Sequence, residues 1–125
     1  MSNSPLRRVR VAAVERVADH IKRFEFVSDD GADLSVFSSG SHVVVTMREG
    51  DQVWRNPYSL MGSPFDTGRY QISVLRVPES RGGSAFMHEK AGVGSVLEIS
   101  EPVNLFPVMH VARKHILIAG GIGIT

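Results

Sequence analysis

Apolar and polar residues alternate along most of the chain, which is the pattern of β-strands with one buried face. Near the start, for example, Val9, Val11 and Ala13 alternate with Arg8, Arg10 and Ala12. Six segments have strand-like patterns: residues 8–16, 21–28, 42–47, 52–60, 70–77 and 96–100. Glycine, proline and aspartate separate these segments at a spacing of roughly ten residues, as in small antiparallel barrels. The pattern predicts an all-β fold, a six-stranded antiparallel Greek-key barrel.

One segment departs from this alternation and predicts a short helix over residues 84–91. Two glycines, Gly82 and Gly83, come before it. Ser84 is a residue type that caps helix N-termini, and Gly92 is a common stop signal. The expected architecture is therefore a barrel with one helix of about two turns.

The last residues have the pattern of a second domain's beginning. The apolar run 115–119 is followed by a glycine cluster at 120–125. A buried parallel strand leading into a glycine-rich turn has this signature, and such a strand needs a crossover and a neighbour. We expect a barrel domain over 1–112 and the first strand of a truncated α/β nucleotide-binding domain over 113–125, in the N-terminal portion of a longer protein. The alternative is an apolar tail.

Composition narrows the function classes. Fourteen Lys and Arg against 13 Asp and Glu leave a net charge of +1, which gives no support to nucleic-acid binding. No apolar run approaches the roughly 18 residues of a membrane span, and no secretory signal is present. The pattern predicts no membrane association and a cytoplasmic location.

The cysteine and histidine content of the sequence gives little support to a metal site or a disulfide. The chain has no cysteine, so it has no disulfide or Cys-ligated cluster among these residues. The histidines are scattered, at His20, His42, His88, His110 and His115. Their spacing is not that of metal ligands, which favours structural or surface roles and predicts no metal site.

The first candidate for chemistry is the segment 55–60. Arg55 offers a planar fork for phosphate oxygens, Tyr58 a flat ring and a phenol, and Ser59 a hydroxyl. Strand alternation places Tyr58 and Ser59 on opposite faces unless Pro57 distorts the strand, and Pro57 requires a bulge or an edge position. The plainer interpretation is a surface arginine, a core tyrosine and an edge proline.

Two glycine-rich turns are the other candidates. The turn 81–84 (RGGS) opens the predicted helix, where free backbone N–H groups and closely approachable glycines can hold an anion. The turn 120–125 follows an apolar strand, where nucleotides bind in α/β sheets. An ordinary turn explains either one taken alone.

Taken in order, these motifs resemble the flavin-binding domain of the ferredoxin–NADP reductase superfamily. The motifs are RNPYSL at 55–60, RGGS at 81–84 and GGIGIT at 120–125. The segments 37–43 and 101–107 also resemble parts of that domain. Within the superfamily, the RGGS turn and the F-x-x-G-x-H segment are most similar to the phthalate dioxygenase reductase and vanillate demethylase reductase group.

The resemblance implies a cofactor and partners. That group carries FMN rather than FAD, and its members combine a flavin barrel, a nicotinamide domain and a plant-type ferredoxin domain. They pass electrons from NAD(P)H through the flavin and a 2Fe–2S cluster to an oxygenase component. For this chain, the resemblance implies FMN in the barrel, with the NAD(P)H site and the cluster outside these residues.

The resemblance also assigns residues to the flavin ring. Ser59 would lie near the flavin N5, where the hydride arrives, and it is the candidate catalytic residue. Leu60 would line the ring. Val74, Leu75 and Arg76 would contact the ring from the next strand.

A second group would bind the rest of the cofactor. Arg55 would bind the flavin phosphate and Tyr58 would contact the ribityl chain. Gly82, Gly83 and Ser84 would cradle the phosphate.

Two further points follow from the resemblance. Thr125 would lie at the junction between flavin and nicotinamide. The family motif has one residue between Arg and Tyr, whereas Asn56 and Pro57 both intervene here. Either Pro57 forms a bulge that restores the register, or Asn56 takes part of the arginine's role.

Two other functions remain open. One is a flavin reductase or NAD(P)H oxidase barrel without an iron–sulfur partner. The other is a non-catalytic β-barrel binding module whose glycine turns are purely structural.

Overall fold

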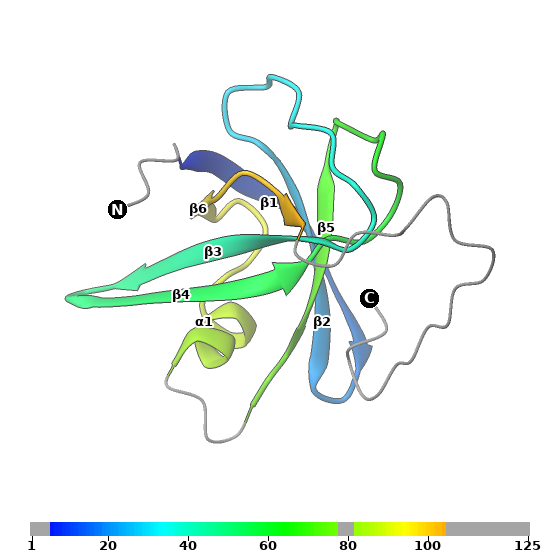
Figure 1. Cartoon of the computed structure of the whole chain (residues 1–125). Helices are drawn as coiled ribbons and strands as arrows, with labels where there is room; N and C mark the ends of the chain where they lie inside the picture. Colours follow the sequence, from blue (N-terminus) through cyan, green and yellow to red (C-terminus); the bar gives the residue numbers. More distant parts are fainter. Residues whose placement is uncertain (1–5, 78–81, 105–125) are drawn as a thin grey trace.

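The computed structural model describes residues 6–77 and 82–104. In this part of the chain the backbone forms seven strands and one helix (Figure 1). The strands are β1 (Arg7–Ala18), β2 (Ile21–Ser28), β3 (Ser41–Glu49), β4 (Gln52–Ser59), β5 (Tyr70–Leu75), β6 (Val96–Ile99) and β7 (Val103–Asn104). The helix is α1 (Gly83–Glu89).

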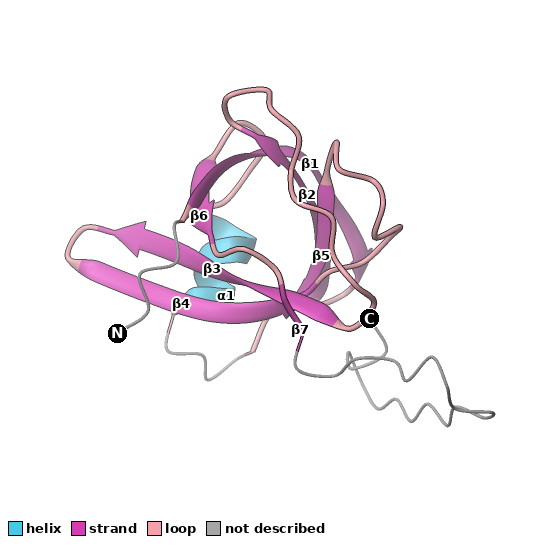
Figure 2. Cartoon of the chain, turned by 45° about the horizontal axis from the view of Figure 1, so that its top comes forward, coloured by secondary structure: helices cyan, strands magenta, loops and turns pink. Residues whose placement is uncertain are grey.

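The strands form one antiparallel sheet in the order β4-β3-β6-β1-β2-β5, with β7 paired to β3. The sheet curls round so that its end strands approach each other, and a single bridge between Met61 and Gln71 joins the two ends (Figure 2). Neighbours that are distant in sequence, such as β3 and β6, require crossing connections as in Greek-key barrels. The predicted antiparallel barrel with one helix is confirmed, and the two-residue β7 is an addition to the six predicted strands.

The buried face of the barrel follows the predicted alternation. Its fully buried large side chains come from several strands, and they include Phe24, Phe26, Tyr70, Ile72 and Ile99. Burial of these apolar side chains is the main stabilising term of the fold. In β1, however, the prediction that Ala13 shares the face of Val9 and Val11 is wrong. The β1–β2 register shifts between Val11 and Ala13, and this bulge leaves Ala13 exposed.

The helix differs from its predicted boundaries at both ends. Gly82 is the N-cap residue, with φ of 127°, and no side chain caps the helix. The prediction that Ser84 is the N-cap is therefore wrong. Its hydroxyl oxygen instead accepts the N–H of Val77 at 3.0 Å. The helix ends at Glu89, before the predicted stop, and Met87 is its fully buried anchor to the core.

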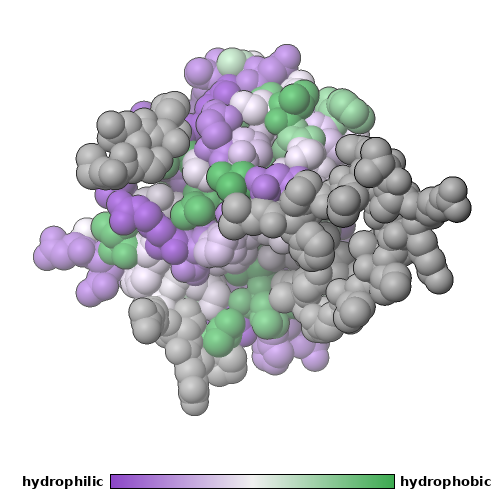
Figure 3. Space-filling model, viewed as in Figure 1, coloured by the Kyte–Doolittle hydropathy of each residue, from purple (hydrophilic) through white to green (hydrophobic). Residues whose placement is uncertain are grey.

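The surface is mixed, and hydrophobic patches alternate with hydrophilic ones on the face drawn in Figure 3. Among the described residues, no helix has the length and apolar character needed to cross a membrane. The predicted start of a second domain, residues 113–125, lies outside the described residues.

Candidate functional site

The segment predicted to carry chemistry lies on β4, and its two faces differ. The pairing of β3 with β4 continues without a shift from Glu49↔Gln52 to His42↔Ser59. Pro57 therefore forms no bulge, and that alternative is wrong. Pro57 is exposed, and β4 is an end strand of the sheet, so the edge position is the correct one.

Because the register is regular, alternate residues of β4 point to opposite faces. Trp54, Asn56 and Tyr58 are half-buried and share the inner face, next to the core. Arg55 and Ser59 are exposed on the outer face. The predicted opposition of Tyr58 and Ser59 is confirmed.

The inner face of β4 lies directly against the glycine turn before α1. A Cβ atom added at Gly82 would come within 2.5 Å of the Trp54 ring. A Cβ atom added at Gly83 would collide with Nδ2 of Asn56. The rigid Trp54 ring therefore excludes a side chain at Gly82, whereas a side chain at Gly83 would displace the Asn56 amide. The β4 segment and the glycine turn, both predicted as candidates, are thus brought together in space. Both glycines have a packing role here, independently of any ligand.

Hydrogen-bond donors converge at this contact. Asn56 Nδ2 donates to the Tyr58 hydroxyl oxygen at 3.3 Å. Burial raises the pKa of Tyr58, and the Asn56 hydrogen bond only partly opposes this effect. The phenol is therefore protonated at neutral pH and keeps its own hydrogen to donate. The first N–H groups of a helix, here from Gly83 onward, have no intrahelical acceptor.

Ser84 follows Gly83 at the helix start and is buried. Its oxygen accepts the Val77 N–H, which leaves its hydroxyl hydrogen as a further donor. Taken together, an amide, a phenol, a hydroxyl and backbone N–H groups form a neutral donor set suited to an oxygen-rich anion.

The residues at the end of β5 that were predicted to contact the flavin ring differ in how far they are buried. Val74 is fully buried, whereas Leu75 is 38% exposed and lies at the end of the strand. Arg76 follows the strand, is exposed and forms an ion pair with Glu89 of α1. Leu60, which follows β4, is buried in the core. The helix packs against β3, β4 and β5, so both predicted segments border it.

Trp54 was not among the residues predicted to form the site. Its ring packs on Phe86 of α1, with centroids 5.9 Å apart, and it overlies the glycine turn. The alternation with Asn56 and Tyr58 was the available signal, because it places all three side chains on one face. Thr125, the predicted junction residue, lies outside the described residues, as does Arg81.

The histidines that the structure describes do not gather with acidic residues. Within residues 6–77 and 82–104, no three His, Asp or Glu side chains are placed to hold a metal ion. His88 has a hydrogen bond from its ring to the backbone of β5. His110 and His115 lie outside the described residues.

Comparison with known proteins gives close relatives. The chain is 50% identical over all 125 residues to the carnitine monooxygenase reductase subunit of Escherichia coli (strain K12). It is 48% identical over 108 residues, 86% of its length, to the vanillate O-demethylase oxidoreductase of Pseudomonas putida. Among solved structures, phthalate dioxygenase reductase superposes on 96% of the chain with a TM-score of 0.89 and 37% identity. The chain belongs to the ferredoxin reductase-like family.

The extent of these matches defines what the relationship covers. The chain spans 39% of the Escherichia coli relative, 33% of the Pseudomonas putida relative and 36% of the phthalate dioxygenase reductase chain. That last protein is described as a modular structure for electron transfer from pyridine nucleotides to a [2Fe–2S] centre. No family model matches the chain. The homologues of this chain are reductase subunits of oxygenases. The barrel of this chain matches the barrel of phthalate dioxygenase reductase.

Proposed function

We propose that this chain is the flavin-holding barrel of a reductase that delivers electrons from NAD(P)H to an oxygenase component. The observation that carries the proposal is the contact between the glycine turn and the inner face of β4, where Asn56, which is hydrogen-bonded to Tyr58, meets Gly83. The names of the relatives support the reductase role. The full relay includes a nicotinamide site and a 2Fe–2S cluster, both placed by the proposal outside these residues.

The donor set fits the phosphate and ribityl end of a flavin. Backbone N–H groups at Gly83 and Ser84 can bind a phosphate because they lie at the helix start, where they have no intrahelical acceptor. Tyr58 and Asn56 supply neutral hydrogen bonds beside it. We assign to Asn56 the role that the family motif gives to its arginine, since Asn56 shares the face of Tyr58. Arg55 then contributes through its long side chain from the outer face.

The remaining predicted residues would surround the ring. Bound flavin supplies the redox chemistry, accepting a hydride from NAD(P)H and releasing electrons singly. Ser59 would donate a hydrogen bond near N5, at the exposed end of β4. Leu60 and Val74 would give the ring an apolar border, and Leu75 and Arg76 would contact it from the end of β5.

The proposal also assigns the type of flavin and the bounds of the domains. We assign FMN in preference to FAD, because the group that the motifs resemble carries FMN. The barrel domain would comprise residues 1–112, and residues 113–125 would begin the NAD(P)-binding domain, with Thr125 at the junction. The whole protein would act in the cytoplasm.

The experiment is a titration of FMN, and separately of FAD, into the purified chain, followed by flavin fluorescence and absorbance. FMN is expected to bind with the higher affinity. Gly83→Ala should abolish or strongly weaken binding, because the added methyl displaces Asn56 from the turn. Gly92→Ala is the matched control, since a Cβ at Gly92 meets nothing within 4 Å. Absence of binding of either flavin by the unsubstituted chain would contradict the proposal.

A further inference from the structure

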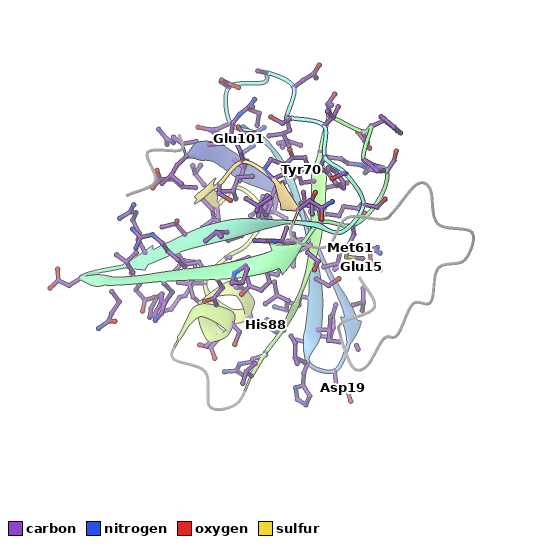
Figure 4. All side chains as sticks on the ribbon, in the orientation of Figure 1. Glu15, Asp19, Met61, Tyr70, His88 and Glu101 are labelled. Carbon is purple, nitrogen blue, oxygen red and sulfur yellow. The ribbon has the colours of Figure 1, made fainter. Side chains whose placement is uncertain are left out.

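Helix α1 is tied to the end of β5 by hydrogen bonds near both of the helix's ends. Near its start, the Ser84 hydroxyl oxygen accepts the N–H of Val77 at 3.0 Å. Near its end, Nε2 of His88 lies 2.7 Å from the carbonyl oxygen of Val74 (Figure 4). A carbonyl oxygen only accepts hydrogen bonds, so the Nε2 atom of His88 carries the hydrogen and donates it.

The surroundings of His88 favour one protonation state. Burial lowers the pKa of His88, and the nearby charges of Lys22, Arg76 and Arg16 add to this effect, against the Val74 hydrogen bond. Lys22 Nζ also donates to the His88 carbonyl oxygen at 2.8 Å. Glu89 on the same helix is paired with Arg76. At neutral pH the ring is therefore neutral, with its hydrogen on Nε2.

The hydrogen bond between His88 and Val74 lies where the helix meets an end strand of the sheet. β5 is an end strand of the sheet that pairs along its length with β2, and on its other side only the bridge from Gln71 to Met61 is present among the described residues. The Val74 carbonyl accepts a hydrogen bond from the His88 side chain of α1. The helix thus supplies a donor to β5 that a neighbouring strand would otherwise supply. The same helix begins at the Gly82–Gly83 turn, which packs on β4. His88 therefore links the strand assigned to the flavin ring with the helix assigned to its phosphate.

We propose that His88 is a positioning residue of the flavin site, which holds the Val74–Arg76 segment at a fixed distance from the glycine turn through its bond to the Val74 carbonyl. This inference rests on the proposed function. It adds that affinity for flavin and the environment of the ring depend on a side chain that does not itself contact the cofactor.

The test compares two substitutions with a control on the same strand. His88→Leu removes the donor, whereas His88→Gln retains an amide N–H donor near the Nε2 position. Tyr70→Phe is the control, because the Tyr70 hydroxyl likewise donates to a backbone carbonyl, that of Ser35, but near the opposite end of β5 (Figure 4). Each chain is titrated with FMN, and the visible circular dichroism band of bound FMN and the thermal unfolding of the flavin-free chain are recorded.

His88→Leu is expected to weaken FMN binding about tenfold, the loss of one well-placed hydrogen bond, and to change the dichroism band. His88→Gln should restore most of both. Tyr70→Phe should lower the unfolding temperature with FMN affinity and band shape unchanged. If His88→Leu fails to fold, His88→Ala replaces it. Alanine likewise removes the donor to the Val74 carbonyl and favours the helix, and the same decrease in affinity is expected.

Two results separate the inference from the proposal on which it rests. If the unsubstituted chain binds FMN and His88→Leu or its replacement leaves affinity and band shape unchanged, the positioning role is overturned and the proposed function stands. If Tyr70→Phe changes the band as much as His88→Leu does, the effect is general to β5 and the positioning role is equally overturned. If the unsubstituted chain binds no flavin, both are overturned.

Discussion

Both faces of β4 carry polar residues, but the surroundings of the two faces differ. On the inner face, Asn56 and Tyr58 are half-buried, bonded to each other and packed near the glycine turn. On the outer face, Arg55 and Ser59 are exposed. The inner side chains are held by their contacts, whereas the outer ones reach into solvent from an edge strand.

This difference explains how one strand can serve two ends of a cofactor. A cradle for phosphate requires fixed donors, since each donor that is ordered beforehand avoids an entropic cost on binding. The inner face provides such donors. The exposed end of the outer face leaves room for a flat ring beside Ser59. Substitutions on the two faces test this division of β4.

Gly82→Ala should have the largest effect, because the inner face depends on the close approach of this glycine to Trp54. The substitution combines a strained φ of 127° with a collision against a rigid ring. We expect a loss of about 3 kcal/mol in the free energy of unfolding, measured by chemical denaturation. Gly94→Ala separates the two causes, because Gly94 has φ of 94° and nothing within 4 Å of an added Cβ. Gly94→Ala should lower the free energy of unfolding by about 1 kcal/mol. Equal losses for Gly82→Ala and Gly94→Ala would show that the Trp54 contact contributes nothing.

Asn56→Ala and Arg55→Ala compare the faces directly. The inner substitution removes an ordered donor and should weaken FMN binding about tenfold. The outer substitution removes an exposed cation and should weaken binding about twofold, an effect that salt screens. Isothermal titration calorimetry at two salt concentrations measures both values. A larger effect at Arg55 than at Asn56 would reverse the assignment of the phosphate contact.

Ser59→Ala should change little in the apo chain, because this side chain is exposed at the end of β4. The free energy of unfolding should stay within about 0.5 kcal/mol of that of the unsubstituted chain. The absorption band of bound FMN should shift, since one hydrogen bond near the ring is lost. An unshifted band would remove Ser59 from the neighbourhood of N5.

A pH dependence is the smallest expected effect. The pKa of His88 lies below its ordinary value of 6.5, chiefly because of burial. The unfolded chain therefore binds a proton at higher pH than the folded chain does, so His88 lowers stability as pH falls below about 6.5 and down to its folded pKa. His88→Gln should show a shallower loss of stability in that window. Parallel curves for the two proteins would contradict the lowered pKa.

The strands could be predicted because their apolar residues recur at every second position, as in Phe24 and Phe26. The bulge in β1 could not be predicted, because alanine is tolerated on the buried and on the exposed face of a sheet. Ala12 and Ala13 therefore do not show which of them faces the core. The helix start was misplaced for a related reason. Ser84 is a good capping residue in general, but here its hydroxyl is used by the N–H of Val77.

The residue types of the site were visible in the sequence, whereas their contacts were not. Strand alternation alone separates Tyr58 from Ser59 and places Asn56 with Tyr58. The packing of Trp54 on Gly82 joins residues far apart in the chain, and local patterns carry no information about such pairs. The Val74–His88 bond was missed in the same way, since a histidine in a short helix gives no sign of its acceptor.

The most direct test of the central claim is an amide NMR titration of the chain with FMN. The backbone signals of Gly83 and Ser84 and the side-chain NH₂ signal of Asn56, assigned by its absence in Asn56→Ala, report on the inner face. We predict that these signals move together and saturate with one FMN per chain. Saturable movement confined to other residues, with the signals of Gly83 and Asn56 unchanged, would contradict it.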